Sequence, residues 1–309
     1  MPDFLLESAF WIGLLAATVR FSAPILFAAL GETIVERAGV LNIGIEGMML
    51  LGAWAAFLGS YAFGVNSLGV LVGVGVGCLG GMILAYLCVT RKAHQIVVGI
   101  TINLFALGLT SFVFREMFAT SLPSISPYKA ANIPLLSGIP VVGEILFRQT
   151  GLVYLAFALV PVTALLFSRT QFGLAVSAAG EMPAAVDASG VSVAKVQYLA
   201  AVIAGGLAGL GGAALSVGQL SQFSDNMTAG RGFFALAVVL LGRWHPVKVM
   251  GATFLFAFAE ALALRLQFNL GIPHQFLKML PFAVAIFLMA GLFGRPRAPS
   301  HLAIPYTRE

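Results

Sequence analysis

The stretch Gly31-Glu-Thr-Ile-Val-Glu-Arg-Ala-Gly-Val-Leu-Asn-Ile-Gly-Ile-Glu-Gly47 places three carboxylates and one arginine between two long apolar stretches. Only 9% of the residues in the chain are charged. An ionisable side chain at membrane depth costs about 2.5–3.5 kcal/mol on insertion scales. The stretch is therefore either an exposed loop between spans or a broken or re-entrant helix beside a transport path. At membrane depth, four side chains should face protein, water or one another rather than lipid: Glu32, Glu36, Arg37 and Glu46.

Composition identifies the broad class of the protein. Hydrophobic residues make up 60% of the 309 residues, and the mean hydropathy is +0.98, which is more apolar surface than one soluble core needs. Several apolar runs reach or approach the roughly 20 residues that cross a bilayer. These features predict an all-α polytopic membrane protein. No cleavable secretory signal is expected, because residues 1–8 carry two acidic side chains and no basic one.

Nine apolar windows indicate membrane crossings, and we expect eight to ten crossings in all. In an alternative segmentation, residues 4–20 and 21–38 form two elements, one of them interfacial. If Arg91 and Lys92 lie in the cytoplasm, most basic residues fall on that side, which favours an inside C-terminus. The net charge of +5 is thus a topology signal rather than a sign of nucleic-acid binding. The windows lie near 9–30, 43–64, 68–90, 96–115, 151–168, 197–219, 232–243, 249–270 and 276–293.

Small residues recur at helical spacing and predict close helix packing. One run repeats every four residues, and a shorter run follows the same spacing later in the chain, so a neighbouring backbone can approach each closely. The two cysteines, Cys78 and Cys88, lie about 15 Å apart along one helix, too far to pair, and are expected to be packing residues. The runs are Gly69, Gly73, Gly77 and Gly81, and then Gly205, Gly209 and Ala213.

Glycine-rich stretches also raise the question of nucleotide binding. The chain has no GxxxxGK[ST] sequence, and Gly73-Val-Gly-Val-Gly77 lies inside an apolar span rather than after a soluble strand. No phosphate-binding loop is therefore expected, and neither a metal nor a cofactor site is indicated. If transport here uses ATP, a partner subunit must bind and hydrolyse it.

A faint internal repeat suggests an inverted architecture. Ala28-Ala-Leu30 and Glu46-Gly47 align at an offset of 185 with Ala213-Ala-Leu215 and Arg231-Gly232. Further on the offset is 180, where His94, Gln95 and Arg115 match His274, Gln275 and Arg295. Five crossings separate the matched starts, so the halves would be inverted in the membrane. Inverted repeats with broken helices are a recurrent transporter architecture, and the window near 232–243 suits a half-helix.

The segment 169–196 is too polar to span the membrane and too rich in alanine for a solvated linker. Pro183 suits the first turn of a short helix through Ala188, and Gly190 suits its end. A short helix with a small apolar face is typical of a docking element on the cytoplasmic side. The alternative is a helix that lies passively at the membrane interface.

The amino-acid sequences of three segments resemble those of a known family. Residues 31–49, the His94-Gln-Ile-Val-Val-Gly99 segment and the Gly180-Glu-Met-Pro-Ala-Ala-Val-Asp-Ala-Ser-Gly190 segment look like permease subunits of bacterial ABC importers. The branch includes ribose-type, branched-chain amino acid and nucleoside permeases. Glu-Arg-Ala-Gly-Val-Leu-Asn at 36–42 is most similar to nucleoside and simple-sugar permeases. The resemblance covers roughly residues 20–295.

The resemblance implies a fold, partners and a location. It implies one transmembrane permease domain over 1–309, similar to type II ABC importers, in the bacterial inner membrane. It further implies an ATPase subunit, a second permease that is more often a sister chain than a copy, and an extracytoplasmic binding lipoprotein. The coupling helix that contacts the ATPase would include Gly180, Glu181, Ala184, Ala185 and Gly190.

Residues for the solute path do not follow from the resemblance and are chosen by their polarity inside or next to apolar windows. Asn103 and Gln219 have an alternative role as hydrogen-bond donors to neighbouring helices, and Glu46 could simply pair with Arg37. The extracytoplasmic segment 116–150 and the turn 220–231 would receive the binding protein. The path candidates are Asn42, Glu46, Asn103, Gln219, Gln222 and Arg231.

Two other classes of protein compete with the importer permease. In an ion-coupled secondary transporter of a small polar solute, Glu46 and Glu260 would be the ion-linked carboxylates. Glu260 and Arg265, five residues apart, are poorly spaced to pair on one helix and could bind other spans. A membrane scaffold would explain the glycine runs but not the charged stretch. For a permease, we expect a nucleoside as substrate first and a pentose or related sugar second.

Overall fold

The computed structural model describes residues 8–118, 123–132, 136–270, 274–287, 290 and 297–307, and nearly all regular structure in these ranges is helical. Among the described residues, seven helices are long and apolar enough to cross a membrane. They are α1 (Ser8–Arg37), α2 (Ile45–Phe63), α3 (Asn66–Ala85, extended by a π-helical turn, Tyr86–Thr90), α4 (Gln95–Phe118), α6 (Gly151–Arg169), α9 (Val193–Leu215, extended by a π-helical turn, Ser216–Leu220) and α11 (Pro246–Leu270).

Shorter elements complete the chain. Two of the nine expected windows form apolar helices that are too short to span the membrane alone. They are α10 (Arg231–Leu241), and α12 (His274–Lys278) with α13 (Leu280–Phe287). The last window, 276–293, extends beyond Phe287 into residues outside the described ranges. The remaining short elements are α5 (Val142–Leu146), α7 (Gln171–Glu181), α8 (Pro183–Ala188), a 3-10 turn (Leu136–Gly138), β1 (Ala130–Asn132) and β2 (Arg148–Thr150).

Ser8–Arg37 form one helix, so the alternative of two elements is wrong for the described residues. α1 continues through Pro24, although proline removes the N–H that would pair with the carbonyl of Arg20. The side-chain amide of Gln219 donates a hydrogen bond to that carbonyl at 2.8 Å. Packing of α1 against α9, α10 and α11 holds the rest of the helix in place.

The charged stretch that follows is buried, so the exposed-loop interpretation is also wrong. α1 ends at Arg37 and α2 begins at Ile45, and most of the turn between them lies in the interior. Glu32, Glu36 and Glu46 are 0%, 5% and 8% exposed. Their carboxylates therefore face protein, as the cost of charge in lipid requires.

The two small-residue runs pack directly against each other. A Cβ atom at Gly205 would lie 2.7 Å from the backbone nitrogen of Gly81, and one at Gly77 would collide with the carbonyl oxygen of Gly205. α3 and α9 therefore touch backbone to backbone, in agreement with the predicted grooves. Both cysteines are free, and Cys88 belongs to the hydrophobic core.

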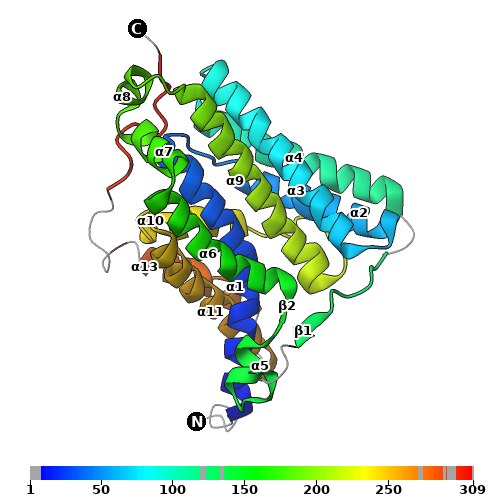
Figure 1. Cartoon of the computed structure of the whole chain (residues 1–309). Coiled ribbons are helices and arrows are strands. Elements are labelled where there is room, and N and C mark those ends of the chain that lie inside the picture. Colours follow the sequence, from blue (N-terminus) through cyan, green and yellow to red (C-terminus); the bar gives the residue numbers. More distant parts are fainter. Residues whose placement is uncertain are drawn as a thin grey trace.

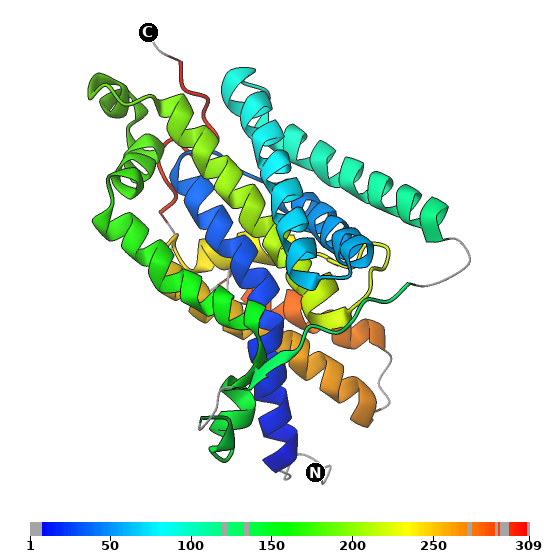
Figure 2. The same ribbon diagram turned by 45° about the vertical axis from the view of Figure 1, so that its right-hand side comes forward.

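One pair of helix boundaries follows the sequence repeat. α3 begins at Asn66 and α11 at Pro246, 180 residues later. α1 and α9 run antiparallel, because Gly31 meets Ala204 while Gly211 meets Pro24, and the colour gradients in Figures 1 and 2 run in opposite directions along them. The helix contacts also follow the repeat. α1 packs on α10 and α11, and its counterpart α9 packs on the corresponding helices of the first half, α2 and α3. This arrangement supports an inverted repeat.

The two ends of the molecule carry different structures. At one end lie α7, α8 and the C-terminal segment; at the other, α5 and the β1–β2 hairpin lie beside the start of α1 (Figure 1). β1 and β2 pair antiparallel, with Ala131 opposite Gln149. The distribution of basic residues predicts that the end with α7 and α8 is cytoplasmic.

We expect Gly77→Val to destabilise the protein, because the added side chain must separate α3 from α9. Overpacking of a tight core costs about 1–3 kcal/mol, and more where backbone is the obstacle. The measurement is the thermal stability of the purified chain in mild detergent. Gly75→Val is the matched control, since nothing lies within 4 Å of a Cβ at that exposed position of the same helix. Equal loss of stability in both variants would contradict the packing argument.

Candidate functional site

Glu46 closes the N-terminus of the short helix α10. Its carboxylate accepts hydrogen bonds from the backbone N–H groups of Gly230 at 2.8 Å and Gly232 at 2.6 Å. Such N–H groups have no partner within their own helix and carry partial positive charge. Gly232 is required there, because a Cβ atom would lie 2.6 Å from the Cα of Glu46. The expected alternative pair with Arg37 does not form, since the guanidinium of Arg37 lies 4.2 Å from the ring centroid of Phe167.

Asn103, on the neighbouring helix α4, forms two hydrogen bonds with the backbone at the start of α2. Its side-chain oxygen accepts from the N–H of Gly47 at 2.7 Å, and its amide donates to the carbonyl of Ile43 at 2.9 Å. The alternative role of Asn103 as a hydrogen-bond partner of a neighbouring helix is thus present in the structure. Asn103 and Glu46 also share a cavity of about 330 Å³, which Asn226 and Gly230 line from the side of α10.

A second cavity lies along the same helix toward its C-terminus. It has a volume of about 400 Å³, and Glu36 and Trp244 line it. The Glu36 carboxylate accepts a hydrogen bond from the indole N–H of Trp244. Phe233, near the start of α10, lines the first cavity, whereas Leu236, Ala237 and Leu240 line the second. One face of α10 therefore connects the two cavities.

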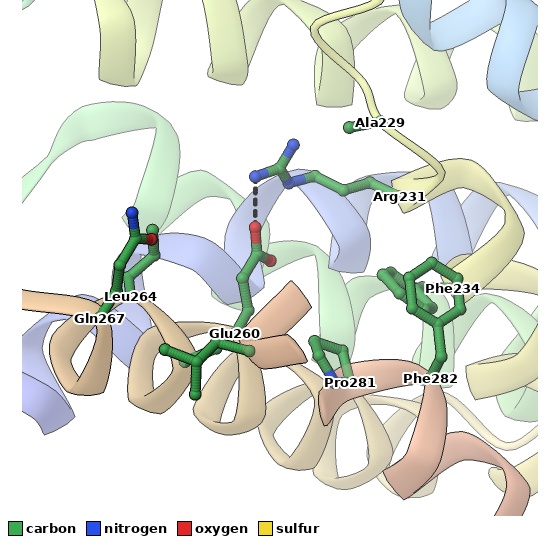
Figure 3. A pocket seen from close by; sticks show the side chains of 10 residues that line it. Ala229, Arg231, Phe234, Glu260, Leu264, Gln267, Pro281 and Phe282 are labelled. Atoms are coloured by element: carbon green, nitrogen blue, oxygen red, sulfur yellow. Dashed lines mark hydrogen bonds and ion pairs between the residues drawn. The ribbon is translucent and has the colours of Figure 1, made fainter. Parts of the chain in front are cut away.

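A third cavity contains an ion pair. Arg231 at the start of α10 points toward Glu260 on α11, and the two form a salt bridge (Figure 3). The cavity has a volume of about 250 Å³. Glu260 thus pairs with another helix rather than with Arg265, which instead donates to the carbonyl of Phe10 at 2.9 Å. This outcome agrees with the poor five-residue spacing.

Three of the path candidates lie outside these cavities. Asn42 is fully buried, and its backbone N–H donates to Glu32 at 3.1 Å, which ties the turn after α1 to that helix. The side-chain amide of Gln219 bonds the carbonyl of Arg20 in α1. Gln222 is exposed in the turn after α9. The structure thus groups Glu46 with Asn103, places Arg231 in a separate cavity, and gives Asn42 and Gln219 structural contacts.

The two segments predicted to face outward lie side by side at the end with the hairpin. The N–H of Ile125 donates to the carbonyl of Ser221 at 3.0 Å, and Arg115 forms a salt bridge with Asp225 at 2.9 Å. Residues 119–122 and 133–135 of the segment 116–150 lie outside the described ranges. The described part forms one surface with the turn 220–231.

At the opposite end, the short helix α8 has the predicted boundaries. Pro183 occupies its first turn, and Gly190 has a positive φ of 83° after its end. Ala184 and Ala185 are exposed, whereas Pro183 and Val186 are buried. α8 therefore packs one face on the protein and presents its alanines outward.

The preceding helix α7 was not expected from the sequence. Its signal is Thr170, whose side chain accepts a hydrogen bond from the N–H of Gly173 at 3.0 Å and so caps the helix. α7 ends beside the end of α1, because Gly180 has no side chain and packs against the carbonyl of Arg37. Movement of α7 and α8 would thus act directly on α1.

No sequence pattern indicated that the C-terminal segment contacts α7 and the turn after α1. Ser300 donates to the carboxylate of Glu181 at 2.8 Å, and the N–H of His301 donates to the carbonyl of Gly180, also at 2.8 Å. The N–H of Ala303 donates to the carbonyl of Gly39 at 3.0 Å. The segment thus joins the end of α7 to the turn after α1, through contacts that no local pattern predicts. The contact of Trp244 with Glu36 was likewise not expected from the sequence.

Comparison with known proteins identifies the family. The family model described as branched-chain amino acid transport system / permease component matches residues 14–289. The guanosine ABC transporter permease protein NupQ of Bacillus subtilis is 34% identical, covering 94% of this chain and 95% of its own. The nucleoside ABC transporter permease protein NupC of Lactococcus lactis is 31% identical, covering 96% and 97%.

A sugar permease is also similar. TsgC13 of Haloferax volcanii, a candidate glucose ABC transporter permease protein, is 40% identical over 84% of this chain and 79% of its own. No solved structure matches the chain significantly. The family match spans most of the sequence, and seven described helices suit a membrane. The chain is therefore a multi-pass membrane protein that belongs to the branched-chain amino acid transport system / permease component family.

Proposed function

We propose that this chain is the permease subunit of an ABC importer that carries a nucleoside into the cell and is energised by a separate ATPase subunit. The observation that carries the choice of solute is similarity over nearly the whole chain to permeases named for guanosine and nucleosides. Glucose, or a related sugar, is the second candidate because of the similarity to TsgC13. The 309 residues contain no Walker A sequence of their own.

The solute path follows the face of α10 that joins the first two cavities. It leads from Glu46 and Asn103, near the start of α10, to Glu36 and Trp244 at its C-terminal end. A second permease packed against this face would complete the walls of the path. The ion-coupled alternative is less well supported, because both carboxylate oxygens of Glu46 bond backbone N–H groups of α10 and one oxygen of Glu260 pairs with Arg231.

Coupling to the ATPase is assigned to α8 and its flanks. The exposed face of Ala184 and Ala185 suits insertion into a cleft, while Gly180 transmits movement to the end of α1. Nucleotide can shift the permease between states only through different affinities for those states. Because α8 is linked to the end of α1 through Gly180, a change in the position of α1 between the two states would change how well α8 fits the ATPase.

The binding protein is assigned to the opposite end. The segment 116–150 and the turn 220–231 together form the surface on that side, joined through Ile125 and Asp225. Solute released there would enter the membrane near the start of α10. The second permease is proposed to be a sister chain rather than a copy.

We expect the double change Ala184→Glu and Ala185→Arg to abolish association with the ATPase, because bulky charged side chains would prevent close packing of α8. Membrane insertion should be retained, since both positions are exposed. The measurement is copurification of the ATPase in mild detergent. The same double change at Ala130 and Ala131, an exposed alanine pair on the hairpin, is the control. Normal association of the α8 variant would remove the docking assignment.

We expect Glu46→Gln to lower solute uptake by about tenfold or more, because one N–H at the start of α10 would face an amide NH₂ instead of an oxygen. A buried donor without a partner costs about 1–3 kcal/mol. Uptake of radiolabelled guanosine is measured beside ATPase copurification and basal ATP hydrolysis. Loss of uptake with an intact complex supports a place on the path. Unchanged uptake would contradict both the capping argument and a place for Glu46 on the path.

A further inference from the structure

The inverted repeat supplies an internal comparison between two cavities. One lies between α10, α11 and the α12–α13 pair and is named here the α10–α11 cavity. The other, of about 450 Å³, lies between α3 and α4 and is named the α3–α4 cavity. At the repeat offset of 180, wall residues of the two cavities coincide: Gly80 with Glu260, Leu87 with Gln267, and Ile102 with Phe282.

The matched positions differ in chemistry. The α3–α4 cavity has glycine, leucine and isoleucine where the α10–α11 cavity has Glu260, Gln267 and Phe282. The same helical arrangement therefore forms without polar groups at these positions. Because polar side chains within the membrane are costly and usually functional, packing alone does not account for Glu260 and Gln267.

The ion pair leaves hydrogen-bonding capacity in the cavity. One carboxylate oxygen of Glu260 bonds Arg231, while the other is buried and has no partner among the described residues. Arg231 also donates to the carbonyl of Met227 at 3.1 Å, which fixes the guanidinium in place. The amide of Gln267, at the other end of the cavity, supplies both donors and an acceptor (Figure 3). A ligand there would meet fixed polar groups at its edge.

An aromatic wall faces these groups. The ring centroids of Phe234 and Phe282 lie 4.8 Å apart, and Pro281 lies beside them (Figure 3). Most of the remaining lining is apolar. A nucleobase suits such a cavity, since its flat face stacks on aromatic rings and its edge forms hydrogen bonds. A free sugar would leave several hydroxyl groups without partners, which is costly.

Size and position agree with this ligand. The volume of about 250 Å³ lies just below the range of drug-sized sites, roughly 300–1,000 Å³, as a small ligand requires. Glu260 lies about 21 Å along α11 from its predicted cytoplasmic start at Pro246, at 1.5 Å per residue. The cavity is therefore in the outer half of the membrane, on the side from which an importer receives solute.

From this geometry we infer that the α10–α11 cavity is a nucleoside-binding subsite of the permease. The base stacks against Phe234 and Phe282, and the free oxygen of Glu260 and the amide of Gln267 bond its polar edge or the ribose. This inference rests on the proposed import of nucleosides and adds a binding site within the membrane. The α3–α4 cavity, being apolar, does not bind the solute.

The test is photolabelling of the complete transporter, with its ATPase and partner permease, in nanodiscs without binding protein. The probe is 8-azidoguanosine, and labelled peptides are located by mass spectrometry. We expect label in the peptides that contain Phe234, Glu260 or Phe282, and protection by guanosine. Phe282→Ala should raise the protecting concentration of guanosine by about 5- to 150-fold, the range for loss of one aromatic stacking partner.

Two further variants sharpen the result. Phe105→Ala makes the same truncation in the wall of the α3–α4 cavity and should leave protection unchanged. Gln267→Leu gives the α10–α11 cavity the residue that the other repeat carries at Leu87, so the fold should be retained while protection weakens. The subsite is overturned if these peptides carry no protectable label, if Phe282→Ala behaves like Phe105→Ala, or if glucose protects and guanosine does not.

Failure of the subsite and failure of the proposed function give different results. Uptake of radiolabelled guanosine by the wild-type transporter with its binding protein is measured in parallel. Guanosine uptake without protectable label in the α10–α11 cavity contradicts the subsite alone. Absence of guanosine uptake, together with uptake of glucose, contradicts the nucleoside assignment itself.

Discussion

The structure depends on how the backbone N–H groups at the start of α10 find hydrogen-bond partners in an apolar environment. A helix that begins within the membrane exposes backbone N–H groups that lipid cannot pair. Glu46 pairs two of them from the start of α2, so the cost of its own burial is offset by charge-assisted hydrogen bonds. This contact also joins the two repeats at the point where their broken segments meet. The helix held in this way lines both cavities of the proposed path.

The two repeats share a frame but have diverged in chemistry. Backbone contact between α3 and α9 is possible only because glycines recur on both helices, and that contact determines how closely the halves approach. Within the frame, matched positions carry Gly80 in one half and Glu260 in the other. The first half therefore offers an apolar cavity, whereas the second offers an ion pair beside two aromatic rings. At these matched positions, only the second half supplies polar groups to its cavity.

The end of the molecule with α7 and α8 is organised around the last residues of α1. Gly180 approaches the carbonyl of Arg37, and the C-terminal segment bonds both the end of α7 and the turn at Gly39. Glu36, on the same end of α1, bonds Trp244 in the second cavity. A displacement of α8 by an ATPase would thus reach a cavity on the proposed path through a short series of contacts. The physical requirement is that these contacts differ between the two facing states.

Local patterns determined much of this protein. Runs of apolar residues, the four-residue spacing of glycines, and Pro183 with Gly190 predicted the long helices, the α3–α9 contact surfaces and the limits of α8, because each depends on residues close in sequence. Sequence alone also indicated the family. Tertiary structure decided the partners: Glu46 with α10 rather than Arg37, Arg231 with Glu260, and Gln219 with the carbonyl freed by Pro24. These partners lie far apart in the chain, and in an apolar interior the location of the nearest unpaired donor or acceptor, which only the fold defines, decides which of them meet.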